Sequence, residues 1–171
     1  MRQRVDLLCS FYDIWARSHP RKTNMTSHSE TKRLPYTADQ MYALVGDVAQ
    51  YPKFLPWTAA ARVRSVTEKG DHAEMLVDLM ISFKVFRETF GSRVLLWPAL
   101  RQIDTSYLDG PFKYLESRWT FQDVDGGCEV SFSVDFEFKN RLLQGAAGIF
   151  FNEAMHRIVG AFETRAEELY R

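Results

Sequence analysis

The sequence predicts an α+β domain in which a curved antiparallel sheet packs against one long C-terminal helix. Residues 128–138 alternate apolar and polar side chains, a pattern typical of a strand with one dry and one wet face. Residues 140–170 contain no proline and carry apolar side chains at helical spacing, so a single helix is expected there. Strands that precede a helix in this way favour the α+β class.

The first strand is expected over residues 27–34, where a proline ends it. Thr37 then fits the N-cap of a helix over residues 38–48, because Gln40 stands three residues later and completes a capping box. The segment 51–57 contains two prolines, which break helix and strand alike, so a short turn or helical stub is expected there.

Five more strands are expected before the last one, joined by tight hairpins. Turn sequences follow three of these segments: Lys69-Gly-Asp71, Asp109-Gly-Pro111 and Asp125-Gly-Gly127. The expected strands are 60–68, 73–81, 83–96, 100–108 and 113–124. Successive hairpins make the sheet antiparallel.

The long helix is expected to face the sheet with a stripe of apolar residues. The stripe consists of Leu143, Ala147, Phe150, Ala154, Ile158, Ala161, Phe162 and Leu169. The small side chains at 147, 154 and 161 leave room between helix and sheet, which predicts a candidate ligand cavity. The alternative is close packing of the helix on the sheet with no cavity.

Composition limits the classes of function. The 171 residues suit one domain with a full core, and their formal net charge of zero argues against nucleic-acid binding. No apolar run is long enough to cross a bilayer. Cys9 and Cys128 are far apart and form no metal-type pair, so a reducing compartment is expected.

Residues 1–26 are expected to be separate from a domain that covers residues 27–171. Aromatic and aliphatic side chains among arginines allow a short amphipathic helix that contacts a membrane or acts as a targeting segment. The favoured alternative is a loosely ordered extension, with Met25 as the functional start.

Few side chains suggest chemistry by their spacing. Glu153 and His156 match the Glu-x-x-His spacing of carboxylate-bridged metal sites, but the second such pair is missing and a solvated surface pair is favoured. Glu88 lies among apolar residues and is a candidate acid with a raised pKa. The favoured alternative is an ion pair between Glu88 and a neighbouring arginine: Arg87, Arg93 or Arg118.

The segment 51–57 displays Tyr51, Phe54, Leu55 and Trp57 on a stretch that two prolines stiffen. Rigid aromatic loops make good portals for apolar ligands. The alternative is that Phe54 and Trp57 simply close one end of the core. The sequence leaves both interpretations open.

An ordered set of short motifs resembles a known family. The motifs are Thr31-Lys-Arg-Leu-Pro-Tyr36, Met41-Tyr-Ala-Leu-Val-Gly-Asp-Val48, Tyr51-Pro-Lys-Phe-Leu-Pro-Trp57, Gly110-Pro-Phe112, Trp119-Thr-Phe121 and Ala161-Phe-Glu-Thr-Arg-Ala166. In this order they resemble the coenzyme Q-binding branch of the START-like superfamily, and the resemblance covers residues 27–171.

The resemblance implies a helix-grip fold, in which a curved antiparallel sheet wraps the C-terminal helix and two short helices follow the first strand. It further implies a quinone chaperone that binds ubiquinone or a related polyprenyl lipid in support of respiration, with no catalytic cofactor. Related members are polyketide cyclases or dehydratases and ribosome-association toxins, so an enzyme with Glu88 as its acid or base, or a ribosome-binding protein, are the alternatives.

On this hypothesis an apolar cavity holds the lipid tail. The residues expected to bind the ligand are Tyr51, Phe54, Trp57, Met75, Val77, Leu79, Trp119, Phe121, Phe132, Val134, Phe150, Ala154 and Ile158. Tyr51, Lys53 and Trp57 are candidate donors to the headgroup. Peripheral membrane contact is expected, at the cytoplasmic face of a bacterial inner membrane or the matrix face of the mitochondrial inner membrane.

Overall fold

The computed structural model describes residues 26–83 and 86–171. The extension predicted over residues 1–26 lies outside the described residues except for Thr26, which begins the first strand.

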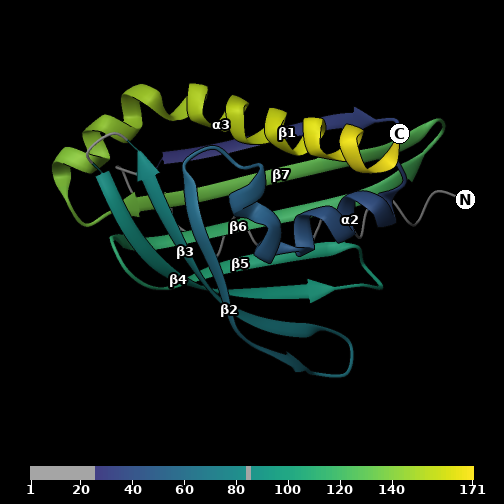
Figure 1. Cartoon of the computed structure of the whole chain (residues 1–171), viewed down its shortest axis with the longest axis horizontal. Helices are drawn as coiled ribbons and strands as arrows, with labels where there is room; N and C mark the ends of the chain where they lie inside the picture. The colour runs from purple at the N-terminus through teal and green to yellow at the C-terminus, as the bar shows by residue number, and fades with distance from the viewer. Residues whose placement is uncertain (1–25, 84–85) are drawn as a thin grey trace, which may run out of the picture.

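Seven antiparallel strands form one curved sheet, and a long helix lies across it (Figure 1). The elements are β1 (Thr26–Leu34), α2 (Ala38–Gly46), the 3₁₀ helix η1 (Val48–Lys53), β2 (Thr58–Glu68), β3 (Ala73–Phe83), β4 (Phe86–Trp97), β5 (Gln102–Asp109), β6 (Phe112–Val124), β7 (Gly127–Phe138) and α3 (Arg141–Tyr170). The strand order is β1-β7-β6-β5-β4-β3-β2, so the chain crosses from one sheet edge to the other through α2 and η1. The predicted α+β class and helix-grip arrangement are confirmed.

The predicted capping box starts α2. Thr37 Oγ1 accepts a hydrogen bond from Gln40 N at 3.1 Å, and Gln40 Oε1 accepts one from Thr37 N at 2.9 Å. The helix predicted over 38–48 ends earlier, at Gly46, and a separate 3₁₀ helix starts at Val48. Pro52 lies inside η1, where its ring prevents a regular α-helix from continuing.

Two hydrophobic clusters cover the concave face of the sheet. The first lies against α2 and the C-terminal half of α3, and includes Met41, Val77 and Phe121. The second lies against the N-terminal half of α3, and includes Phe90 and Phe151. The apolar face of the sheet is therefore divided between two ends of one helix.

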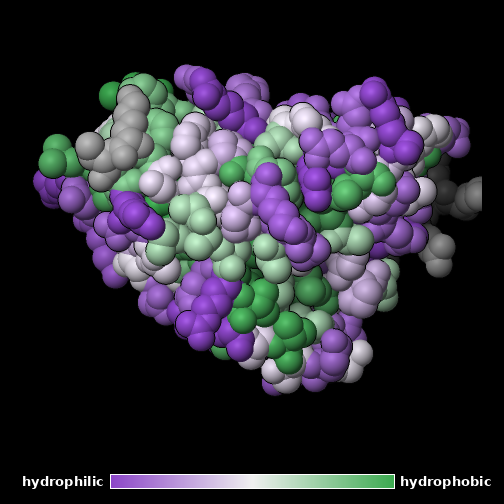
Figure 2. Space-filling view, viewed as in Figure 1, coloured by the Kyte–Doolittle hydropathy of each residue, from purple (hydrophilic) through white to green (hydrophobic). Residues whose placement is uncertain are grey.

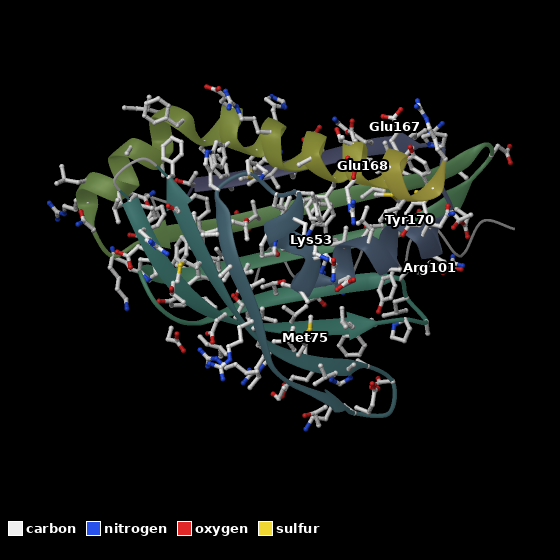
Figure 3. The ribbon with its side chains drawn as sticks, in the orientation of Figure 1. Lys53, Met75, Arg101, Glu167, Glu168 and Tyr170 are labelled. Atoms are coloured by element: carbon white, nitrogen blue, oxygen red, sulfur yellow. The ribbon has the colours of Figure 1, made fainter. Side chains whose placement is uncertain are left out.

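The long helix α3 lies against β1, β7 and α2 (Figure 1). Asn140 caps it by accepting a hydrogen bond from Leu142 N at 2.8 Å. At the other end Tyr170, labelled in Figure 3, donates a hydrogen bond to the Gln40 carbonyl of α2 at 3.0 Å. The C-terminal end of α3 is thus tied to α2.

The predicted inward stripe of α3 is wrong at two positions. Phe150 is 46% exposed and Leu169 is 48% exposed, so neither closes the interior. The buried side chains are Phe151, Val159, Phe162 and Ala166. Residues 150 and 151 are both phenylalanine, so the spacing fits either rotation of the helix and only the packing selects one.

Gly127 in the β6–β7 hairpin lets the chain pass close to the end of β1. A Cβ atom added there would lie 1.9 Å from the Leu34 carbonyl oxygen and 3.0 Å from Pro35 Cα. Both neighbours are backbone atoms, which cannot rotate away as a side chain can.

Gly127→Ala is therefore expected to lower the free energy of unfolding by roughly 3 kcal/mol, near the upper end of the usual cost of overpacking. The control is Gly160→Ala in α3, where an added Cβ meets no atom within 4 Å. That change should raise stability by about 0.5–1 kcal/mol. Urea denaturation measures both, and equal stability of the two variants would contradict the prediction.

Candidate ligand-binding site

Most of the predicted cavity residues come together on the concave face of the sheet. Met75, Val77, Phe121 and Val134 are buried there. Leu79, Trp119, Phe132, Ala154 and Ile158 are half-buried.

Aromatic rings connect the sheet to α3 at this face. The ring of Trp119 stacks on Phe132 with centroids 4.2 Å apart, and its edge meets Phe162 of α3 at 5.3 Å. The sheet and the helix therefore share one apolar interior.

The aromatic residues of the segment 51–57 divide into two groups. Tyr51 and Phe54 pack on Phe162, with ring centroids 5.5 and 5.3 Å apart, so they close one end of the core. The Tyr51 hydroxyl donates to the Val45 carbonyl at 2.6 Å and is already engaged within the protein. Burial raises the pKa of Tyr51, and the Asp47 carboxylate adds to the shift.

Trp57 is placed differently, immediately before β2. Its backbone has φ of 62°, a left-handed conformation that is uncommon for a bulky residue. Its ring packs edge-on against Phe83 at 5.1 Å, and the Arg157 guanidinium of α3 lies 6.0 Å from it. Lys53, the third candidate headgroup donor, is exposed on η1 (Figure 3).

A small apolar pocket lies between β1 and α3. Its volume is about 20 Å³, roughly the space of one water molecule. The apolar residues that line it are Leu34, Met41, Trp119, Val130, Phe132, Val159 and Phe162. A ligand of lipid size fits this pocket only if α3 moves away from the sheet.

An ion pair joins the two walls of this pocket. Lys32 Nζ on β1 lies 2.5 Å from Glu163 Oε1 on α3 and 3.4 Å from Glu30 Oε1. The hydrogen bond that Lys32 donates to Glu163 is the main cause of its raised pKa. Because both side chains are partly exposed, the pair contributes at most about 1 kcal/mol.

The second hydrophobic cluster is less completely covered than the first. Its partly buried members are Leu79, Ile81, Tyr107, Leu115, Phe132, Phe138, Ala147 and Met155. These side chains face the interior from β3, β5, β6, β7 and α3, yet each keeps some exposure. Gly148 of α3 adds space, because a Cβ atom there would meet no atom within 4 Å. The apolar interior is therefore open toward the start of α3.

The opposite face of the sheet is polar. A depression of about 210 Å³ there is lined by charged groups that include Asp104, Glu116, Arg118 and Asp135. Arg118 Nε donates to Asp104 Oδ1 at 2.6 Å. Most of the residues that line this depression are charged or polar, so burial of a lipid tail there would remove polar groups from water.

The candidate chemical groups of the sequence lie outside the apolar interior. Glu88 is exposed, and two of the arginines considered as its partners pair elsewhere, Arg93 with Glu74 and Arg118 with Asp104. Glu153 pairs with Arg157 at 2.6 Å. Over residues 26–83 and 86–171, no group of three or more His, Cys, Asp or Glu side chains is placed to hold a metal ion.

The first turns of α3 expose apolar side chains to solvent. Leu142 is 83% exposed and Ile149 is 77% exposed, and the half-exposed Phe150 lies beside Ile149. Figure 2 shows hydrophobic surface at the end of the molecule where α3 begins. Lys139 and Arg141, both exposed, precede Leu142 in the sequence. Among the helices that the structure describes, none combines the length and the hydropathy needed to cross a bilayer.

Comparison with known families agrees with this architecture. Residues 34–163 match the model of the family described as "Polyketide cyclase / dehydrase and lipid transport". The chain belongs to this START-like family. The resemblance noted from the sequence motifs is thereby confirmed.

Relatives of this chain carry different functional names. It is 36% identical over 150 residues to the ribosome association toxin RatA of Rickettsia prowazekii, covering 86% of this chain and 100% of the relative. It is 34% identical over 148 residues to the mitochondrial coenzyme Q-binding protein COQ10 homolog B of Xenopus laevis, covering 84% of this chain and 59% of the relative.

A solved structure has the same fold. The 18 kDa protein CC1736 of Caulobacter crescentus superposes with a TM-score of 0.72 at 36% identity, covering 85% of this chain and 98% of that one. The family description names cyclases, dehydrases and lipid transport, and the relatives of this chain are named as a ribosome association toxin and as a coenzyme Q-binding protein.

Sequence reasoning missed two features of the site. One is the ion pair between Lys32 and Glu163, which are 131 positions apart, so no local pattern links them. The other is a pair of inward-facing hydroxyl groups, on Ser92 and Tyr107, that interrupts the apolar face. Strand alternation could have found the second, because Ser92 precedes the buried Val94 by two positions.

Tyr51→Phe is expected to lower the free energy of unfolding by about 1–2 kcal/mol, because it removes a buried hydrogen bond and leaves the Val45 carbonyl unpaired. Burial raises the pKa of Tyr51 in the folded state above its unfolded value of 10.0. The contribution of the hydroxyl is therefore complete below pH 10 and is lost as the pH rises through the folded-state value.

Denaturation of both proteins between pH 7 and pH 12 measures the effect. A difference in stability that is zero at pH 7, or that grows above pH 10, would show that the hydroxyl does not have this structural role.

Proposed function

We propose that this protein binds a neutral isoprenoid lipid between the concave face of the sheet and α3, and that ubiquinone is the first candidate. The observation that carries the proposal is the incompletely covered second cluster, whose apolar side chains line the interior without being fully buried. A lipid tail that completes their burial gains roughly 0.8 kcal/mol for each methylene group removed from water.

The distribution of charge supports a neutral tail. The ion pair of Lys32 and Glu163 lies at the β1 side of the interior, whereas Phe90, Phe112 and Phe136 form the buried part of the second cluster. An apolar wall with few hydrogen-bonding groups suits a hydrocarbon chain and disfavours a charged ligand. The relative named as a coenzyme Q-binding protein is consistent with this ligand class.

The exposed first turns of α3 suggest how such a ligand is exchanged. We propose that Leu142, Ile149 and Phe150 insert into the interface of a bilayer, with Lys139 and Arg141 beside anionic headgroups. This surface adjoins the open end of the second cluster, so a lipid could pass between membrane and interior. The membrane would be one that contains quinone: the inner membrane of a bacterium, or of a mitochondrion.

A second candidate is association with the ribosome. The relative named as a ribosome association toxin is matched over its whole length at 36% identity, which is the observation that favours it. Co-sedimentation of the purified protein with ribosomes, combined with an empty lipid extract, would support this function over lipid binding.

The first experiment is organic extraction of protein purified from a ubiquinone-producing host, followed by mass spectrometry. Ala154→Phe, which adds a ring to the helix wall of the interior, is expected to lower the recovered ubiquinone about tenfold, or about 1.4 kcal/mol in affinity. Ala60→Phe makes the same change at an exposed position on β2 and should retain the wild-type amount. Full recovery from a folded Ala154→Phe variant would mean that the ligand does not occupy this space.

Membrane contact is tested by flotation with vesicles of phosphatidylcholine and phosphatidylglycerol. Ile149→Ser is expected to reduce the bound fraction at least tenfold, because burial of an isoleucine side chain in the interface contributes about 1.5–3 kcal/mol. Leu100→Ser changes an apolar residue that is 64% exposed in the β4–β5 turn and should have no effect. Equal loss in both variants would indicate nonspecific adsorption.

A further inference from the structure

Two hydroxyl groups on the concave face have no hydrogen-bond partner among the described residues. They are Ser92 Oγ on β4 and the phenolic oxygen of Tyr107 on β5. Both oxygen atoms are buried, and Ser92 as a whole is only 2% exposed. Buried hydroxyl groups are almost always paired in native proteins, so two unpaired ones require an explanation.

The register of the sheet brings these two residues together. Ser92 lies opposite Tyr107 in the β4–β5 ladder and opposite Val77 in the β3–β4 ladder. Ser92 lies between the buried Phe90 and Val94 in the alternation of β4, so its side chain faces the interior. Tyr107 faces the same way, because its ring meets the buried Phe112 edge-on at 5.7 Å.

The hydroxyl pair marks the boundary between the two hydrophobic clusters. Val77 and Val94 belong to the first cluster, which is closed by α2. Phe90 and Phe112 belong to the second, which opens toward the start of α3. A ligand whose tail lies along the second cluster therefore has its inner end beside Ser92 and Tyr107.

The chemistry of the pair limits what it can hold. Serine and tyrosine hydroxyls donate a hydrogen bond to an acceptor and carry no charge at neutral pH. Val77, opposite Ser92 on β3, is apolar. The charged side chains Glu30 and Lys32 are on β1, which is separated from β5 by β6 and β7. A phosphate or carboxylate would need a cation here, whereas a neutral carbonyl oxygen needs only the two donors.

We infer that Ser92 and Tyr107 bind the carbonyl oxygen of a ketone or quinone headgroup at the inner end of the interior. This inference rests on the proposed lipid-binding function and specifies the ligand class. It replaces the expectation that Tyr51, Lys53 or Trp57 binds the headgroup near a mouth. The headgroup is held deep in the protein, and the tail extends toward the exposed surface of α3.

The test compares two probes with the same short tail: ubiquinone with two isoprene units, and geranylbenzene, which has no carbonyl group. Quenching of tryptophan fluorescence by the quinone measures its affinity, since Trp119 faces the interior, and displacement of the bound quinone measures the affinity of geranylbenzene. Ser92→Ala and Tyr107→Phe are each expected to weaken quinone binding about five- to tenfold, the loss of one hydrogen bond to the ligand. Binding of geranylbenzene should be unchanged.

Tyr114→Phe is the matched control. Its phenolic oxygen is also buried without a partner among the described residues. Burial raises the pKa of Tyr114 to about 12, and the nearby carboxylates of Glu137, Asp135 and Glu116 add to the shift. Two of these carboxylates line the depression on the polar face, so Tyr114 is outside the proposed site. Quinone affinity should be the same as in the wild type.

The outcomes separate the inference from the function on which it rests. If the wild type binds neither probe, the proposed lipid-binding function fails. If the wild type binds both probes but the two variants keep full affinity for the quinone, lipid binding stands and the headgroup site is overturned. If the two variants bind both probes equally more weakly than the wild type, the headgroup site is also overturned. The hydroxyls would then affect only the shape of the interior.

Discussion

The structure depends on the need to cover the concave apolar face of a seven-stranded sheet. An antiparallel sheet of this length can leave one face in water, but the other must be removed from it. One helix, α3, supplies most of the cover, and it lies along β1 and β7 rather than across the middle of the sheet. Strands β3 to β5 are therefore covered incompletely, which is the origin of the open second cluster.

The C-terminal end of α3 is packed more tightly against the rest of the protein than its N-terminal end. At the C-terminal end, Phe162 packs against Tyr51, Phe54 and Trp119, and Tyr170 is hydrogen-bonded to α2. At the N-terminal end, the helix carries glycine at 145 and 148 and exposes Leu142, Ile149 and Phe150. Glycine weakens a helix, and an exposed apolar surface gains free energy when it finds a partner. In the proposed function, ligand exchange at the N-terminal end would leave the packed C-terminal end undisturbed.

Polar groups inside the fold have two separate roles. Lys32 and Glu163 connect β1 to α3 at the edge of the interior, where partial exposure to solvent keeps both ions hydrated. Ser92 and Tyr107 lie deeper, where only neutral groups are tolerated without strong compensation. The interior is thus charged at its edge and neutral at its centre, as the proposed uncharged ligand would require.

The sequence by itself determined the elements and their order. Alternation in β7, the capping box at Thr37 and the glycine turns are local signals, so each could be recognised without its neighbours. Most residues predicted for the interior are on the concave face for the same reason, since strand alternation assigns a side chain to one face or the other.

The tertiary structure decided how the elements face one another. The rotation of α3 selected Phe151 over Phe150, because both rotations fit the spacing and only packing distinguishes them. The tertiary structure also forms the hydrogen bond from the Tyr51 hydroxyl to the Val45 carbonyl, which no pattern in the segment 51–57 indicates. The ion pair of Lys32 with Glu163 joins two elements, and the register of β4 and β5 places Ser92 opposite Tyr107. Such contacts follow from register and helix placement, which local sequence does not encode.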